Sequence, residues 1–138
     1  MTASLTPTLA LDYITALSAD IRAAVVLDAA GAHLAGPVEL ARAAAALPRA
    51  PRVEGETERG AVYAARDERH AIVVVTGPFA LARVTRHDLQ TALAALGGQI
   101  VPSGPVGRLE EGLVRALLDV VGDDFRRPRA KKTSDLEP

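Results

Sequence analysis

Residues 60–85 contain three short apolar segments that are joined by turns of only two or three residues. The segments are GAVYAAR (60–66), HAIVVVT (70–76) and FALARVT (79–85), and each has the length and apolar content of a β-strand. Such short connections predict an antiparallel meander, because parallel neighbours need a long crossover. The middle segment is apolar at successive positions, which predicts a central strand covered on both faces.

A further hairpin is predicted earlier in the chain. Residues 22–28 (RAAVVLD) are apolar and too short for a comfortable helix, and after the turn AAG the residues HLA (33–35) can pair back on them. The stretch 48–59, PRAPRVEGETER, is rich in proline, glycine and charge. This composition predicts a mobile internal loop.

Helical periodicity predicts three helices around these strands. They cover residues 7–18, residues 37–48 and a segment that starts after Thr85 and ends at Gly97. The element order α-β-β-α-β-β-β-α over residues 5–97 then predicts one α+β (α/β) domain. Its five-stranded antiparallel sheet would be covered by helices.

The chain beyond this domain divides into three parts. Residues 98–107 have the composition of a linker, and residues 108–125 predict an amphipathic helix with Leu109, Leu113 and Leu117 on one face. Residues 126–138 hold five basic and two acidic groups, against 11 basic and 15 acidic groups in residues 1–125. This basic tail is expected to be disordered when free.

The residue types argue against catalysis and against a cofactor or metal. The chain has no cysteine, and its three histidines, His33, His70 and His87, fall on different predicted elements without metal-ligand spacing. No GxSxG motif accompanies the serines, and the glycines of 97–107 lack the GK[ST] ending of a phosphate-binding loop. The neighbouring carboxylates Glu110-Glu111 and Asp123-Asp124 are expected to be solvated.

Charge and hydropathy suggest a cytoplasmic protein. We expect no transmembrane segment, because no apolar run approaches the roughly 20 residues that a spanning helix needs. The N-terminus lacks the positive region of a signal peptide. The basic tail could make weak contact with an anionic membrane, but no aromatic residue lies among its charges, so specific nucleic-acid binding is not expected.

This order of elements and two segments of the sequence resemble the roadblock/LC7 family, which implies a single profilin-like domain. ADIRAAVVLDAAG (19–31) is similar to that family's first hairpin, in which an aliphatic strand leads into an aspartate and a glycine turn. AIVVVTGPFALARVTRHDLQTALAAL (71–96) resembles its closing unit, with Leu81, Ala82 and Val84 in a Leu-Ala-x-Val pattern before the last helix. The resemblance covers about residues 5–97 and leaves the C-terminal third outside it.

The resemblance implies a non-enzymatic dimer without cofactors. Members of the family pair through the second helix and the third strand, and they regulate small Ras-like GTPases or serve as adaptors in signalling assemblies. The second helix is short here, which departs from the family pattern. The positions that match the pairing surface are Leu40, Ala43, Ala44, Leu47, Val62 and Ala64.

The sequence therefore predicts a homodimeric regulator or adaptor whose partner is a small GTPase or another signalling protein. The expected partner-binding positions are Leu109, Leu113, Leu117, Arg126 and Arg127. A small-molecule sensor domain of PAS or GAF type is the alternative, and a ligand pocket enclosed by the sheet and helices would favour it.

Overall fold

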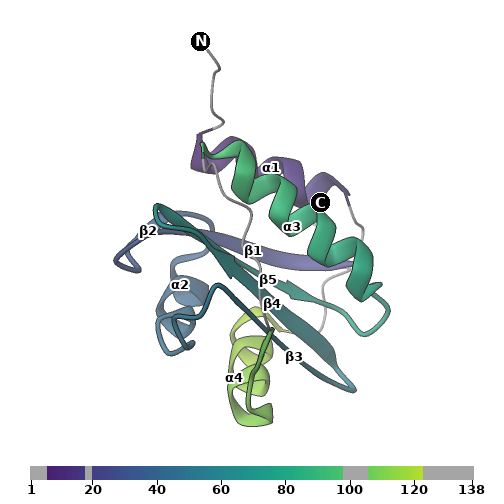
Figure 1. Ribbon diagram of the computed structural model, residues 1–138. Helices are drawn as coiled ribbons and strands as arrows, with labels where there is room; N and C mark the ends of the chain where they lie inside the picture. Colours follow the sequence, from purple (N-terminus) through teal and green to yellow (C-terminus); the bar gives the residue numbers. More distant parts are fainter. Residues whose placement is uncertain (1–5, 18–19, 98–105, 123–138) are drawn as a thin grey trace, which may run out of the picture.

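The computed structural model describes residues 6–17, 20–97 and 106–122, which form one sheet with helices on both faces (Figure 1). The helices are α1 (Pro7–Leu17), α2 (Val38–Ala44), α3 (Ala82–Ala95) and α4 (Glu111–Val121). The strands are β1 (Ile21–Asp28), β2 (His33–Ala35), β3 (Arg52–Thr57), β4 (Gly60–Arg66), β5 (His70–Thr76) and β6 (Gly107–Arg108).

The strands lie in the order β2-β1-β5-β4-β3-β6. All neighbours are antiparallel except β3 and β6, which pair in parallel at Val53–Gly107 and Glu54–Arg108. Strand β5 lies between β1 and β4 and is buried from Ala71 to Thr76, in agreement with its unbroken apolar sequence.

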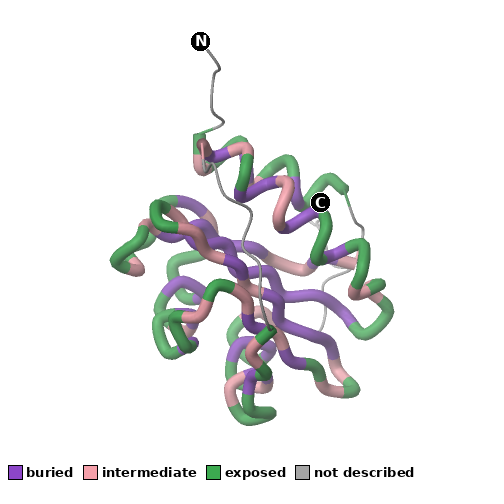
Figure 2. Tube along the Cα trace, in the orientation of Figure 1, coloured by how far each residue is buried: buried purple, intermediate pink, exposed green. Residues whose placement is uncertain are grey.

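Helices α1 and α3 cover the face that is uppermost in Figure 1, and α2 and α4 cover the opposite face. We call the two apolar clusters the upper core and the lower core. The upper core contains Ile14, Ile72 and Leu93, and the lower core contains Leu40 and Leu117. Burial in Figure 2 is accordingly concentrated in the strands and on the inner sides of the helices.

Local side-chain contacts fix the first helix and the first hairpin. The hydroxyl of Thr6 accepts a hydrogen bond from the backbone N–H of Leu9 at 3.2 Å and so caps α1. Oδ1 of Asp28 accepts from the N–H groups of Ala30 and Ala32, each at 2.9 Å, and Gly31 takes a φ of 94° that favours glycine. The predicted hairpin of residues 22–35 is therefore present.

The third strand of the meander is not where the sequence predicted it. Residues 79–85 do not form a strand, because α3 begins at Ala82, and Thr85 is buried inside the helix that was expected to start after it. Strand β3 lies instead within residues 48–59, which we had expected to be a loop. It is polar because only one of its faces is packed, so its residues alternate between buried and more exposed positions.

The prediction of five antiparallel strands is also wrong in number. A sixth, two-residue strand at Gly107–Arg108 joins the edge of the sheet and pairs in parallel with β3. The last helix forms as expected but is shorter than residues 108–125, since it spans Glu111–Val121.

Candidate functional site: the covered face and the exposed surfaces

The residues that the resemblance assigns to dimer pairing lie in the lower core of the single chain. Four of them, on α2, after it and on β4, are buried: Leu40, Ala44, Leu47 and Val62. The other two, Ala43 and Ala64, are partly buried against the same cluster. This surface is therefore covered by other residues of its own chain.

The cover is the C-terminal arm, by which we mean residues 106–122 with β6 and α4. Leu109 and Val114 are buried on the lower face, and the N–H of Leu109 donates to the carbonyl of Glu54 at 2.9 Å. Gly55 permits the close approach of the arm to β3, since a Cβ there would lie 2.7 Å from Val114 Cγ2 and 2.9 Å from Leu109 Cβ. The arm thus occupies both the helix face and the β3 edge.

Ion pairs join the arm to the turn between β3 and β4. Arg59 Nη1 lies 2.8 Å from Asp119 Oδ1, and Arg115 Nη2 lies 3.1 Å from Glu58 Oε1. A backbone hydrogen bond and the Arg115 guanidinium lower the pKa of Glu58, and the carboxylates of Glu111 and Glu58 raise the pKa of Arg115. These groups are largely exposed, so the apolar contacts hold most of the arm's stability.

The expected partner-binding residues fall into two groups. Leu109 and Leu117 are buried in the lower core and Leu113 is partly buried against it, so in the single chain they pack on their own domain. Arg126 and Arg127 lie outside the described residues.

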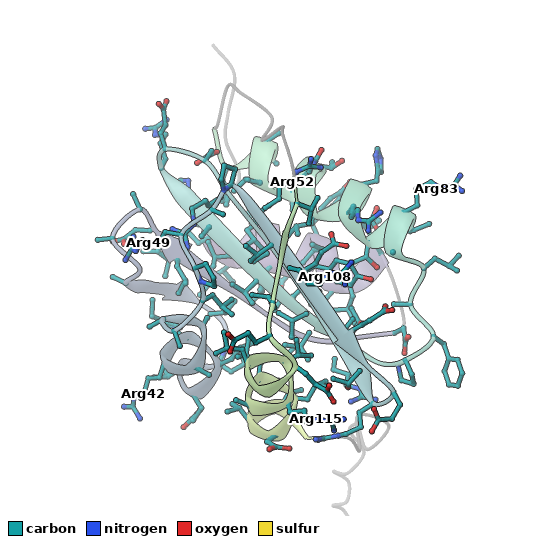
Figure 3. All side chains as sticks on the ribbon, turned by 60° about the horizontal axis from the view of Figure 1, so that its bottom comes forward. Arg42, Arg49, Arg52, Arg83, Arg108 and Arg115 are labelled. Atoms are coloured by element: carbon teal, nitrogen blue, oxygen red, sulfur yellow. The ribbon has the colours of Figure 1, made fainter. Side chains whose placement is uncertain are left out.

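A polar hollow of about 240 Å³ lies on the upper face between α3 and β3. Arg86 donates to the carboxylate of Glu54 from both Nε, at 2.9 Å, and Nη2. Arg108, which is labelled in Figure 3, lines the same hollow. Burial, followed by the charges of Glu54 and Glu56, raises the pKa of Tyr63. The walls are charged, unlike the mostly apolar pockets that bind small molecules.

The sequence did not reveal the hollow because its β3 residues were assigned to a loop. The alternation of Arg52, Glu54 and Glu56 with Val53 and Gly55 is the signal that could have identified this half-buried strand.

Among the exposed apolar side chains of the described residues are three on α1 and two in the loop before α3. Leu9, Tyr13 and Leu17 are spaced four residues apart on α1 and are 52%, 39% and 45% exposed. Phe79 and Leu81, in the loop between β5 and α3, are 85% and 70% exposed. The sequence did not predict exposure for either group, and the Gly77-Pro78 pair before Phe79 was the available signal for a loop.

The histidines are not gathered at one place. Nε2 of His33 lies 2.7 Å from the carbonyl oxygen of Gly36, and His70 and His87 belong to β5 and α3. Within residues 6–17, 20–97 and 106–122, the structure contains no group of three or more His, Cys, Asp or Glu residues that could hold a metal ion.

No helix in the described part of the chain is both long enough and apolar enough to cross a bilayer.

Comparison with solved structures finds a likeness of the fold. No protein-family model matches the chain, and no curated protein matches it. A solved structure of a Roadblock/LC7 domain from Streptomyces avermitillis matches with a TM-score of 0.55 and 19% sequence identity, over 62% of this chain and 93% of that chain. The expected resemblance is therefore confirmed at the level of the fold, and more than a third of the chain lies outside the match.

Proposed function

We propose that this chain is a non-enzymatic regulatory or adaptor protein that acts by binding another protein in the cytoplasm. The observation that carries this proposal is the likeness of the fold to a Roadblock/LC7 domain. The partner is a small Ras-like GTPase or another component of a signalling assembly, as the resemblance of residues 19–31 and 71–96 implies.

The chain works as a homodimer whose assembly depends on the C-terminal arm. With the arm in place, the α2 face and the β3 edge are covered within one chain, so two copies can pair there only if the arm moves. Because the arm follows the rest of the domain in sequence, two copies can exchange arms and keep the same buried contacts, which is a low-cost route to a dimer. The position of the arm would thus set the oligomeric state.

Nucleotide-dependent capture tests the choice of partner. The chain is immobilised and exposed to a lysate of its source organism that contains either GDP or a non-hydrolysable GTP analogue, and retained proteins are identified by mass spectrometry. We expect a small GTPase whose retention changes with the nucleotide, and the purified pair should reproduce that dependence. Retention of the same proteins in both nucleotides would contradict a GTPase partner.

A further inference from the structure

The polar hollow between α3 and β3 is built on a row of side chains that crosses three strands. Tyr63 of β4 is paired with Glu54 of β3, and Glu54 is paired with Arg108 of β6, so the three side chains lie on the same face of the sheet. Ala82 and Arg86 border the hollow from the first two turns of α3. The site is therefore held by four elements of regular structure.

The central carboxylate of this row is already paired. Arg86 donates to both carboxylate oxygens of Glu54, from Nε and from Nη2, and this double contact fixes the geometry of both side chains. Nη1 of Arg86 makes no hydrogen bond with any described residue. The pair is thus a neutral wall of the hollow that still has a donor.

Three polar groups around this pair have no partner in the described part of the chain. The side chains of Arg108 and Glu56 are exposed and form neither an ion pair nor a hydrogen bond with any residue there. Tyr63 is only 4% exposed, and its hydroxyl also has no hydrogen-bond partner among these residues. Buried tyrosine hydroxyls ordinarily have one. The hollow therefore contains an unmatched cation, an unmatched anion and an unmatched hydroxyl.

The hydroxyl and the helix end both favour a negative group on one side of the hollow. Burial raises the pKa of Tyr63, so its hydroxyl remains a donor at neutral pH. Leu81 at the start of α3 provides no side-chain cap, which leaves the partial positive charge of the helix N-terminus next to Ala82, at the edge of the hollow. Together with Arg108, these groups suit a carboxylate.

The charges that line the hollow balance, and this balance decides the class of ligand. Arg86 and Arg108 contribute two positive charges and Glu54 and Glu56 two negative ones, so an ion of a single sign would meet a repelling group. We propose that the hollow binds a small zwitterion, a free α-amino acid, whose carboxylate pairs with Arg108 and whose ammonium group pairs with Glu56. Its volume of about 240 Å³ is below the roughly 300–1,000 Å³ of pockets for drug-sized ligands, which agrees with a ligand of this size.

A second hollow of about 140 Å³ adjoins the first and shares Glu54, Arg86 and Arg108 with it. Val106 and Gly107 complete its lining. This space accommodates the side chain of the amino acid, and Val106 gives it an aliphatic wall.

Arg108 belongs to the C-terminal arm, so the site is complete only when the arm is docked on the sheet. A ligand that bridges Arg108 and Glu56 binds that state alone and therefore stabilises it. The amino acid would thus hold the arm in place.

Titration of the isotope-labelled full-length chain with each of the common L-amino acids tests the class of ligand. Amide chemical shifts are followed by NMR at constant pH and ionic strength. We expect saturable shifts with at least one amino acid at Glu54, Glu56, Tyr63 and Arg108. For that amino acid, the analogue without the ammonium group and the analogue without the carboxylate should each bind about tenfold more weakly or worse, because each loses a charge-assisted hydrogen bond.

Substitutions assign the two ends of the ligand. Arg108→Gln and Glu56→Gln should each weaken binding by about tenfold or more and leave the free energy of unfolding unchanged, because both side chains are exposed. Tyr63→Phe should weaken binding by a smaller factor, since it removes a neutral donor. Arg69→Gln and Glu68→Gln, which change exposed charges in the turn between β4 and β5, are the matched controls and should bind as the original chain does.

Amide hydrogen exchange tests the coupling to the arm. With the amino acid at ten times its Kd, exchange through opening of the arm should slow about tenfold in α4, and this slowing should be absent in Arg108→Gln. Unchanged exchange in α4 would overturn the proposed contact with Arg108.

Other outcomes of the titrations would also overturn the proposal. They are the absence of saturable shifts with every amino acid, and shifts that persist unchanged in Arg108→Gln and Glu56→Gln. If the analogue without the ammonium group binds as tightly as the amino acid, the site takes simple anions and not zwitterions. If no amino acid binds and Arg108→Gln loses a protein that the original chain retains in nucleotide-dependent capture, the same surface is a protein-binding site instead.

Discussion

The two faces of the sheet are covered in different ways. On the upper face, α1 directly precedes β1 and α3 directly follows β5, so each helix packs on a strand that is adjacent in sequence, and α3 also packs on β4. On the lower face, the short α2 covers one side, and α4 arrives from the far end of the described chain to cover β3 and β4. The lower face is therefore complete only when the arm is in place.

Strand β3 shows the consequence of this difference. Its lower side carries Val53 and Gly55, which pack against the arm, and its upper side carries Arg52, Glu54 and Glu56 beside the polar hollow. The edge of the domain is apolar where the arm covers it and charged on the opposite side, where Arg86 of α3 pairs with Glu54.

Removal of the arm should have the largest effect. A chain that ends at Gly97 loses the buried side chains of Leu109, Val114, Leu117 and Leu118. At about 1.5–3 kcal/mol each, they amount to roughly 6–12 kcal/mol, which is comparable with the whole stability of an ordinary domain. We expect the truncated chain to remain folded only as a dimer or larger assembly, as measured by light scattering together with circular dichroism.

The full-length chain is the control for this truncation. A truncated chain that stays monomeric and unfolds at the same urea concentration as the full-length chain would show that the lower core does not depend on the arm. This result would contradict the inference that the lower face is complete only when the arm is in place.

Matched leucine truncations compare the two cores directly. Leu93 on α3 and Leu117 on α4 are 1% and 0% exposed, and each change to Ala should lower the free energy of unfolding by about 2–5 kcal/mol in urea titrations. If the arm opens separately, Leu117→Ala should speed amide hydrogen exchange in α2 and α4 while α1 and α3 stay protected. Leu93→Ala should not produce that pattern.

A glycine pair probes the contact between β3 and the arm with a smaller effect. Gly55→Ala places a Cβ 2.7 Å from Val114 Cγ2 and should cost about 1–3 kcal/mol by overpacking. Gly112→Ala, in the first turns of α4, meets nothing within 4 Å and should stabilise the helix by up to about 1 kcal/mol. Thermal unfolding measures both, and a destabilising Gly112→Ala would show that the arm does not form as an ordinary helix.

The parts of the fold that were predictable are those in which local pattern and burial agree. The IVVV run of β5 is apolar on both sides because both faces of the strand are covered. Asp28 accepts backbone hydrogen bonds within the turn and Gly31 takes a positive φ, which are the roles that these residue types favour. Strand β3 was missed because its polar upper side and its glycine resemble a loop, and its pairing depends on partners distant in sequence.

The candidate surfaces were less predictable for the same reason. The apolar spacing of Leu109, Leu113 and Leu117 identifies a face that must be buried, but it does not specify whether a partner or the same chain buries it. The exposure of Phe79 depends on α3 starting at Ala82, and neighbouring residues alone do not determine that start.

The smallest expected effect concerns Tyr63, at the boundary between the upper core and the uncovered part of β3. Burial, with the charges of Glu54 and Glu56, raises its pKa above the usual 10.0. The folded state therefore holds this proton more tightly than the unfolded state does. Tyr63 therefore makes a contribution to the free energy of unfolding that is fully present below about pH 10. This contribution is lost as the pH rises through the raised pKa.

Tyrosinate absorbance in a Tyr13→Phe background, which leaves Tyr63 as the single tyrosine, measures this pKa. Glu54→Gln should lower it, because the change removes a negative charge and also leaves the opposing charge of Arg86 without its carboxylate partner. Glu68→Gln, an exposed change in the turn after β4, is the control and should leave the titration unchanged. An equal response to both substitutions would show that Tyr63 senses the overall charge of the domain rather than the carboxylates beside it.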